Sequence, residues 1–260
     1  MYRHLIGQAV LGLAVFFAAI GLAHAGSFSV NPVRVTLSAK QPVAAITVRN
    51  AGAEPAVVQL EISAWSQDQG QDVLVPTNEV LATPPIFTVP AGKTQILRVG
   101  LRRPTTATDE TTYRLVLREV PPPAAPTQQG LRVALKISMP VFVVPAASVA
   151  PALNWRTTRT ADGEIRVHLT NTGTAHVQVS KIELALAEAG TALGTQTTAG
   201  YVLPGNTRSW TVKTTSPAAV GEKVHIRSMT DAGAFERDVP LEVETAAEVT
   251  TPSAPPLVAR

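Results

Sequence analysis

The stretch Leu131-Arg-Val-Ala-Leu-Lys-Ile-Ser-Met139 alternates strictly between large apolar residues and other residues. Successive side chains of a β-strand point to opposite faces, so the pattern predicts a strand with one apolar face. That face would consist of Leu131, Val133, Leu135, Ile137 and Met139. A strand that continues to Val144 would exceed the usual ~5–6 residues. It would either pack on its own domain's core or form a long apolar edge that a second chain must cover.

Short runs rich in Val, Ile, Thr and Leu, separated by Pro, Gly, Asn and Asp, continue on both sides of this strand. Runs of this kind predict strands, and their spacing favours β-sandwiches over units that alternate strand and helix. The expected strands are Arg34–Ser38, Ala45–Asn50, Ala56–Ala64, Thr94–Leu101, Thr112–Val120, Leu131–Val144, Ala152–Arg156, Glu164–Asn171, Val177–Ala187, Thr207–Thr214, Lys223–Thr230 and Asp238–Val243.

The Pro-Ala-Ala-Ser stretch at Pro145–Ser148 predicts a boundary between two domains. We expect an N-terminal immunoglobulin-like sandwich over residues 26–146, including the strand 131–144, and a C-terminal sandwich over 147–245. Residues 246–260 are rich in Thr, Ala and Pro, and we expect them to form a flexible tail.

The first 25 residues are typical of a cleaved secretory signal peptide. Arg3 supplies positive charge, Leu5–Leu22 is apolar, and Ala23-His24-Ala25 forms a small-x-small cleavage site. The apolar run approaches the ~20 residues of a membrane anchor, which is the alternative. Since no stop-transfer charge follows, cleavage after residue 25 is favoured, and the protein is expected to be exported and soluble.

The composition excludes several classes of protein. Hydrophobic residues make up 45% and charged residues 16%, which argues against a disordered chain. The net charge of +3 is too small to indicate nucleic-acid binding. Cysteine is absent, which excludes disulfides, thiolate zinc sites and a cysteine nucleophile. The chain also lacks GxSxG, HExxH and phosphate-binding glycine motifs, so we expect no enzyme, no cofactor and no metal.

Five titratable residues outside such motifs are interpreted as ordinary polar residues. His168 and His176 fall in one predicted hairpin, but two imidazoles without a third ligand do not indicate a metal site. Asp109 and Glu110 lie in a Thr-rich connection, and Asp231 lies in a later hairpin. We expect these carboxylates to be solvated turn residues.

A series of motifs then gives a family resemblance. In chain order they are Asn31–Arg34, the proline pair and Pro/Gly turn of Ala82–Arg98, Tyr113–Pro122 with its Arg-Glu-Val-Pro-Pro ending, Leu131–Pro145, His168–Gly173, Val202–Gly205 and Asp231–Ala234. In this order and spacing they resemble the periplasmic pilus chaperones of the PapD-like family. The resemblance covers nearly all of the chain after the signal peptide and points to a divergent branch of the family.

The resemblance implies two immunoglobulin-like domains in a boomerang arrangement, located in the periplasm. Family members cap incomplete pilus subunits by lending them a strand, here the odd-numbered face of Leu131–Met139, and deliver them to an outer-membrane usher. Strand addition combines backbone pairing with side-chain pockets, which suits the alternating pattern. A free chaperone with this strand uncovered is expected to be able to cap itself as a homodimer.

The resemblance also implies a cationic anchor for the C-terminal carboxylate of the subunit. Arg34 matches one of the family's two cations. The second cation stands five residues before the proline that closes the strand, and that position here is Pro140. Lys136 and Arg98 are the candidate substitutes. Pro140 also predicts an edge or bulge position, where pairing with another chain would end near Met139.

Two other classes remain as alternatives. One is an exported immunoglobulin-like structural or adhesion module, and the other is a glycan-binding sandwich. Glycan sites use exposed aromatic side chains, whereas aromatic residues are only 5% of this chain. Trp65, Trp155 and Trp210 are scattered over separate segments, and we expect them in the core. The ordered motifs favour the chaperone.

Overall fold

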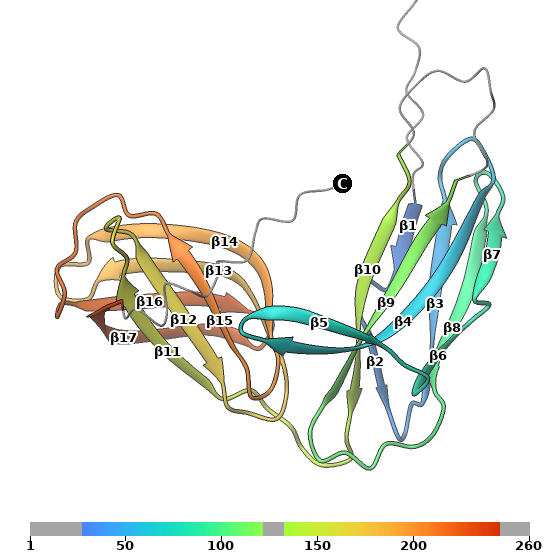
Figure 1. Ribbon diagram of the computed structural model, residues 1–260, viewed down its shortest axis with the longest axis horizontal. Helices are drawn as coiled ribbons and strands as arrows, with labels where there is room; N and C mark the ends of the chain where they lie inside the picture. Colours follow the sequence, from blue (N-terminus) through green and yellow to red (C-terminus); the bar gives the residue numbers. More distant parts are fainter. Residues whose placement is uncertain (1–27, 122–132, 245–260) are drawn as a thin grey trace, which may run out of the picture.

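The computed structural model describes residues 28–121 and 133–244, which form seventeen β-strands and no helix. Figure 1 shows two β-domains joined at an angle by a short connection. The prediction of an all-β protein with two domains is confirmed. Within these described residues, no helix could cross a membrane. The expected signal peptide, the tail 246–260 and Leu131 lie outside the described residues.

The N-terminal domain is a sandwich of two sheets. Its strands are β1 (Phe28–Asn31), β2 (Val35–Ser38), β3 (Val43–Asn50), β4 (Ala56–Asp68), β5 (Gln71–Pro76), β6 (Val80–Thr83), β7 (Ile86–Val89), β8 (Thr94–Leu101), β9 (Thr111–Val120) and β10 (Lys136–Val144). One sheet has the order β1-β3-β8-β6. The other has the order β2-β10-β9-β4-β5, with β7 also paired to β4. The chain changes sheets between β1 and β2, and this places Arg34 at the crossing.

Alternation along the strands fills the space between these two sheets. On β10, Met139, Val141 and Val143 are at most 2% exposed and belong to the domain's core. They pack with the inward-facing residues of the opposite sheet, among them Ile46 and Leu97. The residues between them point to the other face of the sheet, which looks toward the second domain.

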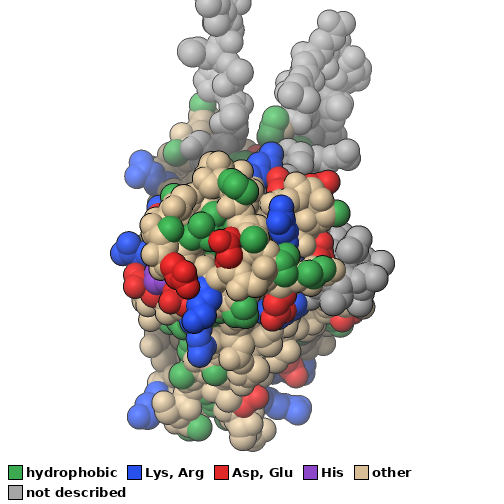
Figure 2. All heavy atoms as spheres, turned by 90° about the vertical axis from the view of Figure 1, so that its left-hand side faces the viewer, with side chains coloured by type: hydrophobic (Ala, Val, Ile, Leu, Met, Phe, Trp, Pro, Cys, Tyr) green, Lys and Arg blue, Asp and Glu red, His purple; other side chains and the backbone are tan. Residues whose placement is uncertain are grey.

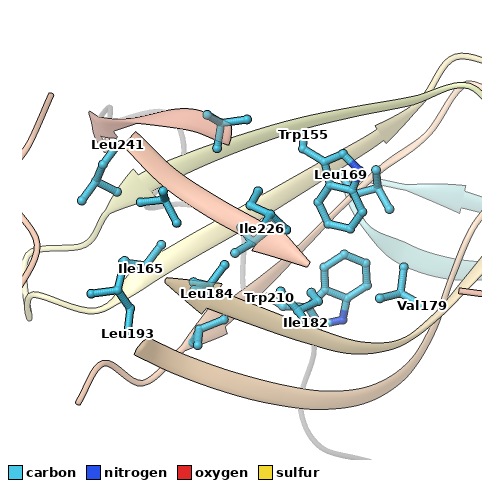
Figure 3. Close-up of a cluster of buried hydrophobic side chains, with 14 of the residues drawn as sticks. Trp155, Ile165, Leu169, Val179, Ile182, Leu184, Leu193, Trp210, Ile226 and Leu241 are labelled. Atoms are coloured by element: carbon cyan, nitrogen blue, oxygen red, sulfur yellow. The ribbon is translucent and has the colours of Figure 1, made fainter. Parts of the chain in front are cut away.

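The C-terminal domain has its own core. Its strands are β11 (Leu153–Arg159), β12 (Ile165–Asn171), β13 (Val177–Leu186), β14 (Ala192–Val202), β15 (Thr207–Val212), β16 (Lys223–Thr230) and β17 (Gly233–Val243). Strand β17 pairs first with β16 and then with β11, and so joins the two halves of the domain. Trp155 and Trp210 lie inside this core, as expected (Figure 3).

The surface of this domain carries no extended patch of one charge on the face seen in Figure 2, where acidic and basic side chains are interspersed. Charges of both signs alternate on this face, so it carries no large field of one sign.

The strand predictions differ from the structure in identifiable places. Strand β10 begins at Lys136, because its partner β9 ends at Val120, directly before Pro121, which has no N–H to continue the ladder. Strand β4 runs four residues beyond the expected Ala64. Five strands were not predicted from the sequence, because four of them are short and the fifth is rich in Gly and Thr: β1, β5, β6 and β7, and β14.

Candidate functional site

One edge of β10 is open over half of its length. Strand β9 pairs with Lys136–Val143 on one side, whereas β2 pairs only with Val141–Val144 on the other. No described strand lies beside Lys136–Pro140 on that second side. The Glu119 N–H donates to the Leu135 carbonyl over 2.8 Å, so the odd-numbered residues exchange backbone hydrogen bonds with β9. The backbone groups of the even-numbered residues therefore face the open edge.

Pro140 sits on this open edge, where its missing N–H breaks no pair with β9. This is the kind of position at which a sheet tolerates proline. Beyond it, β2 takes over the edge from Val141 onward. The prediction that Pro140 marks an edge position agrees with this register, and a second chain could pair with at most the part of β10 before it.

The odd-numbered side chains change from exposed to buried along the strand. Val133 is 60% exposed, Leu135 and Ile137 are half-buried, and Met139 is 2% exposed inside its own domain's core. A small gap in the open end of the sandwich is lined by Leu135 and Ile137 together with Phe28. The apolar face available to another chain is therefore shorter than the predicted one and ends before Met139.

The even-numbered face of β10 leads into the contact between the domains. Phe142 is 1% exposed and packs in a buried cluster with Trp65 of β4 and with Tyr201 and Leu203 of the C-terminal domain. Gln67 joins the same contact: its amide donates to the Tyr201 carbonyl over 2.9 Å and accepts from the Leu203 N–H over 3.0 Å. In Figure 1 the β4–β5 hairpin extends to the second domain.

Arg34 lies at this junction and contacts the C-terminal domain. Its guanidinium donates to Asp231 (2.8 Å), to the Gln178 side-chain oxygen (2.6 Å) and to the Tyr201 hydroxyl (3.2 Å). The side chain remains 34% exposed. Burial lowers the pKa of Arg34, but its bonds to Tyr201 and Asp231 outweigh that effect and raise it.

A second polar link lies beside Arg34. Glu110, expected in a solvated turn, is instead 8% exposed, and its carboxylate is 2.6 Å from His176 Nδ1. His176 Nε2 lies 3.5 Å from Asp231. Burial lowers the pKa of His176, but the hydrogen bonds and charges of Asp231 and Glu110 together raise it. The imidazole also stacks on Phe142 at 3.5 Å between centroids. The solvated-turn interpretation of Glu110 was wrong, because residues of the second domain cover it. Asp231 does lie in an exposed turn of that second domain, but its carboxylate is paired with Arg34 and His176.

His168 has a different environment. It is 8% exposed and hydrogen-bonds through its two ring nitrogens to the hydroxyls of Thr158 and Ser209, over 2.9 and 2.8 Å. Burial, helped by the charges of Arg156 and Arg166, lowers its pKa to about 4. His168 is thus a neutral structural residue, and the described residues contain no cluster of three or more His, Asp or Glu able to hold a metal.

The structure separates the two suggested substitutes for the second cation. Lys136 is exposed on the even-numbered face of β10, four residues or ~13 Å along the strand from Pro140. Arg98 is exposed on β8, between the core residues Leu97 and Val99, and so points away from the sandwich on the opposite sheet. Neither makes a contact with Arg34 among the described interactions.

A cation that was not predicted from the sequence lies nearer to Pro140 than Lys136 and Arg98 do. Arg114 of β9 pairs across the sheet with Pro140, and its guanidinium carbon lies 3.7 Å from the Trp65 ring centroid. Its side chain is 15% exposed. Arg114 stands between the apolar residues Tyr113 and Leu115 in an alternating strand, so the sequence pattern shows that it faces away from the core. The pattern does not show that it contacts Trp65 and Asp72 on that face.

Comparison with known proteins places this geometry in a class. A family model described as the pili and flagellar-assembly chaperone PapD N-terminal domain matches residues 27–148, and one described as the pili assembly chaperone PapD C-terminal domain matches residues 148–239. Two-domain chaperones of pilus assembly are therefore the class that this fold defines. The chain belongs to the PapD family of pili-assembly chaperones, which are not enzymes.

Individual relatives agree with this assignment. The chaperone protein FimB/FhaD of Bordetella pertussis is 26% identical over 196 residues, which covers 70% of this chain and 78% of that protein. The CsuC–CsuE chaperone–tip adhesion subunit complex of Acinetobacter baumannii matches with a TM-score of 0.60 and 20% identity, covering 84% of this chain and all of the matched chain. The SafB–SafA chaperone–pilin complex of Salmonella enterica gives 0.56 and 21%, covering 82% and 96%.

Proposed function

We propose that this protein is a periplasmic chaperone that caps incomplete pilus subunits by adding β10 to them and delivers them to an outer-membrane usher. The observation that carries the proposal is the open edge of β10 at Lys136–Pro140, which no described strand covers. Removal of residues 1–25 during export is part of the same proposal, as is self-capping of the free protein as a homodimer.

The open edge supplies the two components that strand addition needs. Backbone groups of Lys136 and Ser138 point outward and can pair with any strand of suitable register. Val133, Leu135 and Ile137 are exposed or half-buried beside them and can fill apolar pockets of a subunit. Met139 is buried in the core of its own domain, and Leu131 lies outside the described residues. Backbone pairing gives an affinity that tolerates different subunit sequences, and the side chains set the register.

Arg34 is proposed to hold the C-terminal carboxylate of the subunit. A guanidinium binds carboxylates with a planar pair of donors, and Arg34 is one-third exposed at the start of β2, beside the end of the open edge. The Asp231 carboxylate lies 2.8 Å from the Arg34 guanidinium, and a subunit carboxylate would compete with it for these donors. Lys136 or Arg98 could add a second charge only if the bound subunit reaches beyond the cleft.

The test is a pair of charge substitutions on opposite faces of the same segment. Val133→Asp places a carboxylate in an apolar pocket of the subunit and should reduce recovery of a co-expressed pilus subunit at least ~10-fold. Ala134→Asp adds the same charge one residue later, on the exposed other face, and should leave recovery unchanged. Both side chains are exposed, so both variants should fold. Equal recovery with both variants would contradict strand addition through this face.

A further inference from the structure

The base of the N-terminal sandwich contains a cavity of about 490 Å³, at the end of the domain from which β10 leads into the second domain (Figure 1). Its floor reaches the core, because Tyr113 of β9 and Val143 of β10 line it and are only 5% and 1% exposed. Sites for small ligands have volumes of ~300–1,000 Å³, so the cavity is large enough for one. It lies seven residues or ~23 Å along β10 from Lys136, where the open edge begins.

Hydrogen bonds fix the two walls of the cavity. One wall is the turn before β6, where the Glu79 N–H donates to the Thr77 hydroxyl over 3.2 Å. The other wall is the connection from β8 to β9, where the Ala107 N–H donates to the Thr105 hydroxyl over 3.2 Å. The Arg102 N–H donates to the Glu79 carbonyl over 2.8 Å and so joins the two walls. The cavity is therefore formed before a ligand binds, as is usual for small-molecule sites.

Two arginines line this cavity without a carboxylate partner. The chain bends at Arg102 and Arg103, directly after β8, and both exposed side chains belong to the lining. Among the described residues, no carboxylate forms an ion pair with either of them. The single carboxylate of the lining is Glu79, which accepts from the Tyr113 hydroxyl over 2.7 Å. Two arginines and one glutamate leave the lining with a net charge of +1.

Tyr113 holds the Glu79 carboxylate away from the two arginines. Burial and the bond to Glu79 raise the pKa of Tyr113, so its phenol is neutral and donates its hydrogen. The planar donors of Arg102 and Arg103 are thereby left for a ligand, and a guanidinium fork matches a carboxylate. Leu101 and Val143 add apolar surface to the same lining. The ligand that matches these groups has one negative charge and an apolar body.

We propose that this cavity binds an amphipathic monocarboxylate, with its carboxylate on Arg102 and Arg103 and its apolar body against Leu101 and Val143. One negative charge balances the charge of the lining, whereas the second charge of a phosphate monoester would be repelled by Glu79. The site is separate from the open edge of β10, so the carboxylate and a subunit strand can occupy the same protein.

The test uses 3-phenylpropionate, its neutral amide and 2-phenylethyl phosphate as probes of the chain from residue 26 onward. Isothermal titration measures the affinities, and NMR shifts of the Val143 and Ile137 methyl groups distinguish the cavity from the open end of the sandwich. The acid should bind with a dissociation constant of ~1 mM or lower and shift Val143. It should bind at least ~10-fold more tightly than the amide, and more tightly than the phosphate.

Substitutions of opposite charge in the lining should change the affinity for the acid in opposite directions. Replacing both arginines, by Arg102→Gln with Arg103→Gln, should reduce the preference for acid over amide to below ~3-fold. Glu79→Gln still accepts from Tyr113 but removes the opposing charge, and should strengthen acid binding ~3-fold or more. The matched control is Arg49→Gln, which removes an exposed arginine of β3 outside the lining and should keep the wild-type affinities.

Several results would overturn this assignment. No saturable binding of the acid at ~10 mM would do so, as would equal affinities for acid and amide. Shifts at Ile137 without shifts at Val143 would place the ligand at the other end of the sandwich. Tighter binding of the phosphate, or weaker acid binding in Glu79→Gln, would show that charge balance does not select a monocarboxylate here. None of these results would contradict strand addition, which uses the opposite end of β10.

Discussion

At the scale of single residues, His176 links the two domains through a charge that depends on pH. Its raised pKa means that the protonated imidazole binds Glu110 and Asp231 better than the neutral one. Stabilisation from this residue is therefore complete below its unfolded pKa of ~6.5 and is lost as the pH rises through the raised value. Asp231 acts in the opposite direction, because its hydrogen bonds outweigh burial and lower its pKa to about 2. Its contribution is lost only in strong acid.

The first prediction follows from the raised pKa of His176. His176→Gln removes the charge but keeps a polar side chain, and should lower the free energy of unfolding by ~1.5–3 kcal/mol near pH 6. The thermal midpoint should fall by roughly 3–10 °C at that pH, and the difference from wild type should shrink toward pH 8.5. Thermal unfolding followed by circular dichroism at several pH values measures this.

The control is His225→Gln, which removes an exposed histidine that is also 2.6 Å from an aspartate, Asp238. An exposed pair contributes little, so this variant should follow the wild-type profile. Working above pH 6 keeps His168 neutral, since its pKa is about 4. A constant gap between His176→Gln and wild type across the whole range would contradict the proposed charge.

These residues also mark where prediction from sequence ends. Arg34 was predicted from the resemblance of Asn31–Arg34 to the pilus chaperones. Trp155 and Trp210 were predicted in the core because apolar runs enclose them, and they lie there. Glu110, His176 and Asp231 lie in polar connections between strands. The sequence of such a connection looks the same whether it faces water or another domain. Their pairing joins positions 66 and 55 residues apart, which no local pattern records.

At the scale of elements, β10 combines two roles in one strand. Its second half is a core strand held between β9 and β2, and its first half is an edge. The alternation of Leu131–Met139 predicts a strand but cannot show where the domain's own core ends. That point is set by where β2 begins to pair, at Val35, and by where β9 stops. Strand β14 escaped prediction for a related reason: its Gly and Thr residues become a strand only by pairing with β13.

A proline scan of the edge gives the second prediction. The Ser138 N–H points to the open side, so Ser138→Pro should preserve pairing with β9 and cost the domain little stability. It removes one inter-chain hydrogen bond and should weaken subunit binding at least ~10-fold. Ser138→Ala keeps the N–H and should bind as wild type. Affinities from isothermal titration compare the two variants.

The amide proton exchange of the Ile137 N–H distinguishes a local effect from unfolding. That group bonds to β9 and should stay protected in Ser138→Pro. Normal subunit affinity in a folded Ser138→Pro protein would show that the subunit uses another edge.

At the scale of the whole molecule, the two domains share one buried cluster. Phe142 comes from the strand that is proposed to be donated, and it packs against His176, Tyr201 and Trp65. Gln67 adds two buried hydrogen bonds across the same contact. The angle between the domains and the position of β10 are therefore set by the same side chains.

The third prediction tests this coupling. Wild-type protein should unfold in one calorimetric transition, because opening the contact exposes the cluster and leaves Gln67 unpaired. Phe142→Ala should cost ~3–5 kcal/mol and split the transition into two, since each domain retains a separate core.

Phe235→Ala is the control: it removes an aromatic ring stacked on Trp155 inside the C-terminal domain and should lower the midpoint without splitting the transition. A single transition in Phe142→Ala, or two in the wild type, would show that the domains are coupled by contacts other than this cluster.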